Sequence, residues 1–358
     1  MMTRVLTVDP ARPDPAAIEE AAAALKDGKL VAFPTETVYG LGAHALNPSA
    51  VQKIFEAKGR PATDPLIVHI AHIGQVGQCA MGMPPAARKL ALTFWAGPLT
   101  LVLRKKPEVP SLVTAGLDTV ALRVPAHRVA RALMETAGIP IAAPSANRFS
   151  RPSPTTAQHV MADLDGKVDL ILDGGPTDIG LESTIVDFTV DPPVLRRPGG
   201  ITLEQIQEHL PDVVAQSAAS DGTSPQVAPG QLIRHYAPSA TMTVYEGDAG
   251  AVVARIAADT RTAVAQGDRV GILAPEEDLA ALAPLLAPVA ARGRVEVQPI
   301  GSRADLDRSA RELFGSIRAL DATGVSLILA SSPGREGLAR AIHDRLTRAA
   351  EGRVRTIV

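Results

Sequence analysis

Residues 139–156 read IPIAAPSANRFSRPSPTT, a short apolar strand that turns polar within a few residues. The polar part carries hydroxyl, amide and guanidinium groups, on Ser145, Asn147, Ser150, Ser153, Thr155, Thr156, Arg148 and Arg151. In open α/β sheets, ligands bind just beyond the ends of strands. The stretch therefore predicts a strand that ends at a ligand, and its donors favour a phosphate group.

Strand-like and helix-like segments alternate over the first 210 residues. Apolar runs predict strands at residues 30–34, 66–70, 99–103, 120–124, 139–143, 170–174 and 183–188. Amphipathic segments between several of these runs predict helices. We expect residues 1–210 to form one α/β or α+β domain built around a sizeable sheet.

Residues 242–358 show a more regular pattern, in which four apolar strands are each followed by a helical segment. Four such units predict a small parallel sheet with a Rossmann-like layout. No G-x-G-x-x-G follows the first strand, so the pattern does not predict dinucleotide binding. Residues 211–241 are rich in Ser, Ala, Pro and Gly, which predicts a linker, yet their RHYAP motif contains Arg234, His235 and Tyr236.

Composition narrows the class of protein. A length of 358 residues favours two domains, and a formal net charge of -2 gives no general sign of nucleic-acid binding. Cys79 is the single cysteine, which excludes a disulfide framework and fits a reducing cytoplasm. The first residues lack the apolar core of a signal peptide, and no apolar stretch is long enough to span a bilayer. We expect a cytoplasmic protein without a membrane partner.

Two stretches combine polar side chains with backbone features that suit a ligand. In KGRPATDPL, Lys58 and Arg60 end a helix, and the prolines around them predict a fixed loop that could aim both cations at one phosphate chain. Charged helix ends are more often simply solvated. In TETVYGLG, Thr35 and Thr37 offer hydroxyls and the glycines allow close backbone approach, although an ordinary turn explains that stretch equally well.

Single polar residues within apolar strands are the other candidates. His69 lies on a predicted strand, where a histidine is more often a core residue than a ligand. Arg123 interrupts an apolar strand and needs an anionic partner, which could be a structural carboxylate or the carboxylate of a substrate. The residues together suit a site that binds a nucleotide and a small substrate and acts by positioning and charge neutralisation. No Walker A sequence or metal-ligand spacing is present.

Eight motifs, in order, identify a family: FPTETVYGLG, KGRP…DPLIVH, GPLTLVL, LRVPAH, PSAN, SPTTAQHV, GLESTIVD and RRPGGIT. With RHYAP and the extra C-terminal domain, the chain resembles the two-domain branch of the YrdC-like threonylcarbamoyl-AMP synthases. The resemblance implies a twisted mixed sheet with a deep cavity, followed by a smaller Rossmann-like domain. It covers roughly the whole chain and is strongest over residues 30–203.

The resemblance also implies the reaction. L-threonine, bicarbonate or CO2, and ATP with Mg²⁺ give L-threonylcarbamoyladenylate and pyrophosphate. A partner complex then transfers the threonylcarbamoyl group to tRNA, so the synthase itself requires no stable nucleic-acid partner. The alternative is an RNA-binding module with a concave basic surface and no turnover, which the net charge and the scarcity of aromatic residues disfavour.

Residue roles follow from the matching motif positions. For threonine, the resemblance implies Thr35, His69, Arg123, which takes the carboxylate, Ala143 and Ser183. For the nucleotide it implies Lys58, Arg60, Thr119, Ser145, Asn147, Ser153, Arg197 and Tyr236, with Lys58 and Arg60 as the catalytic cations on the phosphates. The motifs depart from the family pattern at Ala96, Phe149 and Ser150, and at Gln231, Leu232 and Ile233 before RHYAP.

Overall fold

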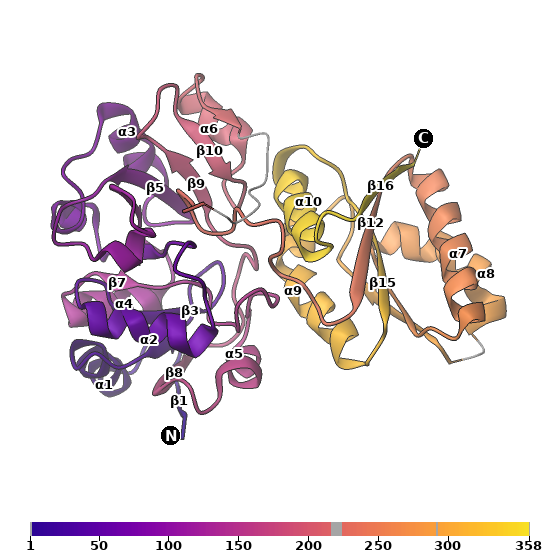
Figure 1. Ribbon diagram of the computed structural model, residues 1–358, viewed down its shortest axis with the longest axis horizontal. Helices are drawn as coiled ribbons and strands as arrows, with labels where there is room; N and C mark the ends of the chain where they lie inside the picture. Colours follow the sequence, from indigo (N-terminus) through magenta and orange to yellow (C-terminus); the bar gives the residue numbers. More distant parts are fainter. Residues whose placement is uncertain (1, 216–223, 291–292, 358) are drawn as a thin grey trace. The chain divides into compact units, whose positions relative to one another are not determined.

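The computed structural model describes residues 2–215, 224–290 and 293–357, and the chain divides into two compact units (Figure 1). Unit 1 comprises Met1–Phe149, Ser153–Asp178 and Glu182–Leu232. Unit 2 comprises Ser150–Pro152, Ile179–Leu181 and Ile233–Val358. The boundary at Leu232 falls inside the predicted linker 211–241, of which residues 216–223 lie outside the described part.

Unit 1 is built on an eleven-stranded mixed sheet, which confirms the predicted fold class. Its order is β1-β8-β2-β3-β7-β4-β6-β5-β9-β10-β11. Three strands at one edge, β1, β8 and β2, are mutually parallel, whereas β3 and β7 run antiparallel to their neighbours. The strands are Arg4–Thr7 (β1), Val31–Phe33 (β2), Gly40–His44 (β3), Ile67–His69 (β4), Leu99–Arg104 (β5), Thr119–Arg123 (β6), Ile141–Ala142 (β7), Leu170–Asp173 (β8), Thr184–Asp187 (β9), Val194–Arg197 (β10) and Val214–Ala215 (β11).

Helices cover both faces of this sheet. The core on one face contains residues of α1 (Pro15–Lys26) and α4 (Arg128–Ala137). The core on the other face contains residues of α2 (Pro48–Lys58), α3 (Pro85–Phe94), α5 (Ala157–Leu164) and α6 (Leu203–His209). Alternate residues of β2 divide accordingly, because Val31 and Phe33 join the first core and Ala32 the second. Short 3-10 turns at Ile73–Gln78 and Ser111–Thr114 complete the unit.

The TETVYGLG stretch differs from its prediction as a turn or ligand-approach loop. Residues Gly40–His44 form strand β3, which pairs antiparallel with β2 and β7. A Cβ at Gly42 would lie 2.8 Å from the Phe33 ring, so this glycine is required by packing between strands. Glycine has low strand propensity, which is why the sequence pattern missed β3.

Capping residues fix both ends of α2 and thereby the positions of Lys58 and Arg60 in the chain. The side chain of Asn47 caps the first turn, and Pro48 occupies the first helical position. Gly59 ends the helix in the left-handed conformation, with φ of 64°. Lys58 therefore sits in the last helical turn, and Arg60 begins the loop that follows.

Unit 2 contains a five-stranded parallel sheet in the order β14-β13-β15-β12-β16. Four strands match the predicted units: Thr241–Gly247 (β12), Val270–Ala274 (β13), Val295–Pro299 (β14) and Leu327–Ser331 (β15). The fifth, Val354–Ile357 (β16), was not predicted, because its two middle residues are polar and exposed. The helices are Ala249–Gln266 (α7), Glu276–Ala290 (α8), Leu306–Ala322 (α9) and Gly337–Ala349 (α10). Among the helices described, none is long and apolar enough to cross a membrane.

Candidate functional site

Neighbouring strands of unit 1 bring together residues that are predicted to bind the substrate threonine. His69, at the end of β4, and Arg123, at the end of β6, are paired in register across these parallel strands. Thr100 on β5 is the register partner of Arg123 from the other side. The Thr100 hydroxyl lies 2.7 Å from the Ser183 hydroxyl, so Ser183 is joined to the same group.

The carboxylate that faces Arg123 belongs to Glu36, a residue that sequence reasoning did not single out. Arg123 Nη2 lies 2.7 Å from Glu36 Oε1, and both side chains are buried. Nη1 of Arg123 donates to the Thr37 hydroxyl at 3.0 Å, and Nε donates to the Gly97 carbonyl at 3.3 Å. The sequence did contain a signal for Glu36, because in the TET triplet its carboxylate lies between two threonines of a predicted ligand loop.

One acceptor of this group is left over. Oε1 of Glu36 is engaged by Nη2 of Arg123 in the ion pair, whereas Oε2 accepts no hydrogen bond from the residues that the structure describes. Glu36, Arg123 and His69 are only 5%, 3% and 3% exposed. Because buried polar groups in native proteins nearly always have partners, Oε2 of Glu36 is a candidate contact for a polar ligand.

His69 is neutral in this surrounding. Burial, and then the positive charge of Arg123, lower the pKa of His69 to about 3. Its ring meets that of Phe33 edge-on, with centroids 6.4 Å apart. A neutral imidazole can form a hydrogen bond to a ligand without adding charge to the group.

Two other residues predicted to bind the substrate threonine, Thr35 and Ala143, already make hydrogen bonds within the protein. The Thr35 hydroxyl donates to the Val38 carbonyl at 2.7 Å and lies 2.8 Å from the Thr37 hydroxyl. It therefore shapes the loop in addition to any contact with substrate. The Ala143 amide donates to the Ile67 carbonyl at 2.9 Å, which fixes the end of the 139–143 strand against β4.

Lys58 joins α2 to the polar stretch after β7. Its Nζ donates to the carbonyl oxygens of Ser145 and Asn147, each at 2.5 Å. The Phe149 amide donates back to the Lys58 carbonyl at 2.9 Å. The PSAN loop is thus folded around the lysine.

Asp64 is a second carboxylate that sequence reasoning missed. Its Oδ2 lies 3.0 Å from Nη2 of Arg60, while Arg60 also donates to the backbone carbonyls of Asp64 and Pro65. Burial raises the pKa of Asp64, and the charges of Arg60, Lys58 and Arg197 oppose that rise. Three cations, all of them residues predicted to contact the nucleotide, therefore act on one buried carboxylate.

Arg197 and Ser183 connect the nucleotide and threonine groups. Arg197 donates to the Ser183 carbonyl at 3.0 Å and to its hydroxyl at 3.1 Å. Another of its nitrogens donates to the carbonyl of Pro229, within the predicted linker, at 3.3 Å. Ser153 donates to the Glu182 carboxylate, next to Ser183. The two predicted subsites thus form one continuous network.

Thr119 and Tyr236 are the remaining predicted nucleotide residues. Thr119 starts β6, four residues before Arg123, which at the rise of a strand is about 13 Å away. Tyr236 belongs to unit 2, where its ring centroid lies 5.2 Å from that of Phe314 and 5.3 Å from the Arg345 guanidinium carbon. Its φ of 63° is unusual for a non-glycine residue, and ring packing on both sides holds it there.

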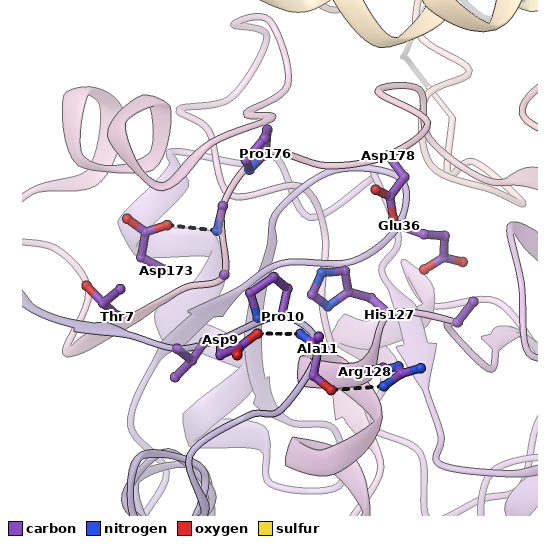
Figure 2. Close-up of a pocket in the computed structure, with 14 residues that line it drawn as sticks. Thr7, Asp9, Pro10, Ala11, Glu36, His127, Arg128, Asp173, Pro176 and Asp178 are labelled. Atoms are coloured by element: carbon purple, nitrogen blue, oxygen red, sulfur yellow. Dashed lines mark hydrogen bonds between the residues drawn. The ribbon is translucent and has the colours of Figure 1, made fainter.

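A cavity of about 1050 Å³ lies at the carboxyl ends of the parallel strands β1, β8 and β2 (Figure 2). Figure 2 shows Glu36, His127 and Asp178 near one another on its wall. His127 Nδ1 accepts from the Val129 amide, so a neutral ring carries its proton on Nε2. Burial lowers the pKa of His127, and the charges of Asp178 and Glu36 oppose the change. Glu36 thus borders both this cavity and Arg123.

Comparison with known proteins supplies a family for this arrangement. Residues 23–199 match a family described as "Telomere recombination" (Sua5, YciO and YrdC), and residues 201–351 match the "Threonylcarbamoyl-AMP synthase, C-terminal domain". The threonylcarbamoyl-AMP synthase of Pyrococcus abyssi is 44% identical, covering 94% of this chain and 95% of the relative. That of Bacillus subtilis is 45% identical and covers 94% of each.

Solved structures agree with the sequence comparison. A crystal structure of P. abyssi Sua5 complexed with L-threonine matches 100% of both chains with a TM-score of 0.89 and 42% identity. The crystal structure of Escherichia coli YciO covers 56% of this chain and 97% of its own, with a TM-score of 0.50 and 24% identity. The second match supports only the fold of the first part of the chain.

Proposed function

The chain belongs to the threonylcarbamoyl-AMP synthase family, and from this premise we propose how its site performs the synthesis. L-threonine, bicarbonate or CO2, and ATP are joined to give L-threonylcarbamoyladenylate, with release of pyrophosphate. The family membership does not favour the alternative of an RNA-binding module without turnover.

Threonine binds at the group formed by β4, β6 and the TET loop. Arg123 takes its carboxylate, His69 and Ser183 supply neutral hydrogen-bonding groups, and Thr35 and Ala143 line the site. The observation that carries the proposal is the buried Arg123–Glu36 pair beside His69, in which Oε2 of Glu36 accepts no hydrogen bond from the described residues. A small ligand with both charges and a hydroxyl would satisfy these groups.

The nucleotide binds on the adjoining side of the network. Lys58 and Arg60 hold the phosphates with Arg197, and Ser145, Asn147, Ser153, Thr119 and Tyr236 contribute the remaining nucleotide contacts. The carbamate of threonine attacks the α-phosphate, and pyrophosphate leaves. Side chains form no covalent bond in this scheme, so rate enhancement comes from positioning and from cations that neutralise developing charge.

Mg²⁺ enters the proposal only as the ion that accompanies ATP. The charged groups predicted to act on the phosphates are cations, and the carboxylate beside them, Asp64, is already paired with Arg60. These residues fit phosphate oxygens and do not fit a protein-held cation, so we assign no step to the metal. Its ligands would be phosphate oxygens and water.

The product passes to a separate complex that modifies tRNA. We place this chemistry in the cytoplasm, in keeping with the tRNA substrate of that later step. A stable complex of this chain with nucleic acid is not required, since the product is a small adenylate.

The test is pyrophosphate release from Mg-ATP and bicarbonate, with and without L-threonine. We expect release that depends on threonine and falls at least 100-fold in Lys58→Ala, because one phosphate cation is lost. Lys53→Ala is the matched control, since Lys53 lies on the same helix and donates to the Gly28 carbonyl instead. Release independent of threonine in the wild type would contradict the proposed substrate.

A further inference from the structure

Glu36 is a buried carboxylate with acceptor capacity to spare. Its side chain is 7% exposed, and Oε1 lies 2.7 Å from Nη2 of Arg123. Its other oxygen, Oε2, accepts no hydrogen bond from the residues that the structure describes. An ion pair balances the charge of a carboxylate but leaves most of its lone pairs without donors, which is costly in a buried place.

Arg123, the other member of the ion pair, has a hydrogen-bond donor to spare. Nε and Nη1 of Arg123 already donate to Gly97 and Thr37, and Nη2 faces Oε1 of Glu36. Because Nη2 carries two N–H groups, one of them remains available beside Oε2 of Glu36. An α-amino acid presents a carboxylate and an ammonium group on a single carbon atom, and it can satisfy both at once.

His69 and Thr35 offer no negative charge to an ammonium group. His69 is neutral, because burial and Arg123 lower its pKa to about 3. The hydroxyl of Thr35 is engaged with Thr37 and Val38. Glu36 is the carboxylate that the structure pairs with Arg123, and it also borders the open cavity of Figure 2, which leaves room for ligand atoms.

We propose that Glu36 binds the α-ammonium group of the substrate while Arg123 binds its carboxylate. Glu36 thereby determines specificity for an amino acid over the same acid without its α-ammonium group. This inference deepens the proposed function and rests on it, since it assumes that threonine lies beside Arg123. The discrimination arises because a ligand without the ammonium group leaves the buried carboxylate without a donor.

Three ligands test the inference by calorimetric titration. L-Threonine has both charged groups, 3-hydroxybutanoate lacks the amine, and 1-aminopropan-2-ol lacks the carboxylate. The wild type should bind threonine at least tenfold more tightly than 3-hydroxybutanoate. In Glu36→Gln, threonine affinity should fall at least tenfold, and that of 3-hydroxybutanoate should stay the same or rise, because a repelling charge is removed.

The ratio of the two affinities separates specificity from folding. A variant that merely loosens the site would weaken both ligands equally, and that result would overturn the inference. Glu36→Asp keeps the charge opposite Arg123 and should retain part of the preference for threonine. Asp9→Asn is the matched control, because Asp9 lines the same cavity but accepts from the Ala11 amide, and its threonine affinity should not change.

The activity assay distinguishes failure of the role assigned to Glu36 from failure of the proposed function. Threonine-dependent pyrophosphate release by the wild type, combined with unchanged discrimination in Glu36→Gln, would refute the role of Glu36 and leave the proposed function intact. A wild type that neither binds threonine nor responds to it would refute both. Weaker binding of 1-aminopropan-2-ol by Glu36→Gln than by the wild type would give independent support, since that ligand does not need Arg123.

Discussion

The carboxylate of Asp64 lies 3.0 Å from the guanidinium group of Arg60, and both side chains are almost completely buried. The charges of Lys58 and Arg197 also act on this carboxylate. Asp64 therefore balances part of the positive charge that the nucleotide phosphates would meet. A substrate phosphate must compete with an anion that is already part of the protein.

Replacing Asp64 by asparagine should strengthen binding of ATP and pyrophosphate. The amide keeps the shape of the side chain, Arg60 remains tied to two backbone carbonyls, and one negative charge beside the phosphates disappears. We expect dissociation constants for both ligands to fall by about 3- to 10-fold in calorimetric titrations.

The control for this prediction is Asp187→Asn. Asp187 is a buried carboxylate of the same unit, and it pairs at 2.7 Å with Arg196 on the more exposed side of β10. That variant should lose stability without changing nucleotide affinity. Weaker ATP binding by Asp64→Asn would mean that the carboxylate mainly holds Arg60 in place.

Arg123→Lys should raise the KM for threonine by about 10- to 100-fold and leave the KM for ATP nearly unchanged. Lysine keeps the charge but cannot donate to Gly97, Thr37 and a substrate carboxylate at the same time. Steady-state pyrophosphate release at varied threonine and varied ATP measures both constants. An equal rise in the two would indicate general damage to the site.

His69 should make the protein less stable as the pH falls. In the folded state its pKa is lowered to about 3, compared with about 6.5 in an unfolded chain. The unfolded state therefore binds the extra proton between these values, and the free energy of unfolding should drop by about 1.4 kcal/mol per pH unit as the pH falls below about 6.5.

Denaturant unfolding at pH 7.0, 6.0 and 5.0 measures this contribution. The difference between wild type and His69→Gln should shrink toward low pH, because glutamine does not titrate. An identical pH dependence in wild type and His69→Gln would contradict the assigned pKa.

Gly199→Ala should destabilise unit 1 by about 1 to 3 kcal/mol and weaken binding of both substrates. A Cβ at this position would lie 2.4 Å from the Glu182 carbonyl and 2.5 Å from the Thr184 amide, so the backbone that carries Ser183 must shift. Gly77→Ala is the control, since its Cβ would meet nothing within 4 Å. Thermal unfolding and threonine titration check the two effects.

Removing residues 240–358 should lower the rate of synthesis. Unit 2 includes Ser150–Pro152 and Ile179–Leu181, which directly precede Ser153 and Glu182. Within that unit, Arg318 donates to the Pro152 carbonyl and Asp321 pairs with Arg151 at 2.7 Å. Loss of these contacts should free both loops. Unchanged kinetics and unchanged product retention in the truncated protein would contradict this role.

Local sequence signals were sufficient for much of the fold. Apolar runs marked most strands, and Asn47, Pro48 and Gly59 marked the ends of α2, because burial and capping act on near neighbours in the chain. Strand β3 escaped because it contains two glycines, and β16 because half of its residues are exposed and polar. In both, pairing with neighbouring strands overrides a weak local preference.

The motifs of the sequence alone determined the family and the reaction it implies, and they supplied the residues predicted for each substrate. Only the tertiary structure decided what Arg123 and Arg60 pair with, because Glu36 reaches Arg123 through strand packing and Asp64 is defined as a site residue by the cations gathered around it. A sequence states which charges a chain contains. Which of them are buried together, and in which ion pairs, depends on how distant segments pack.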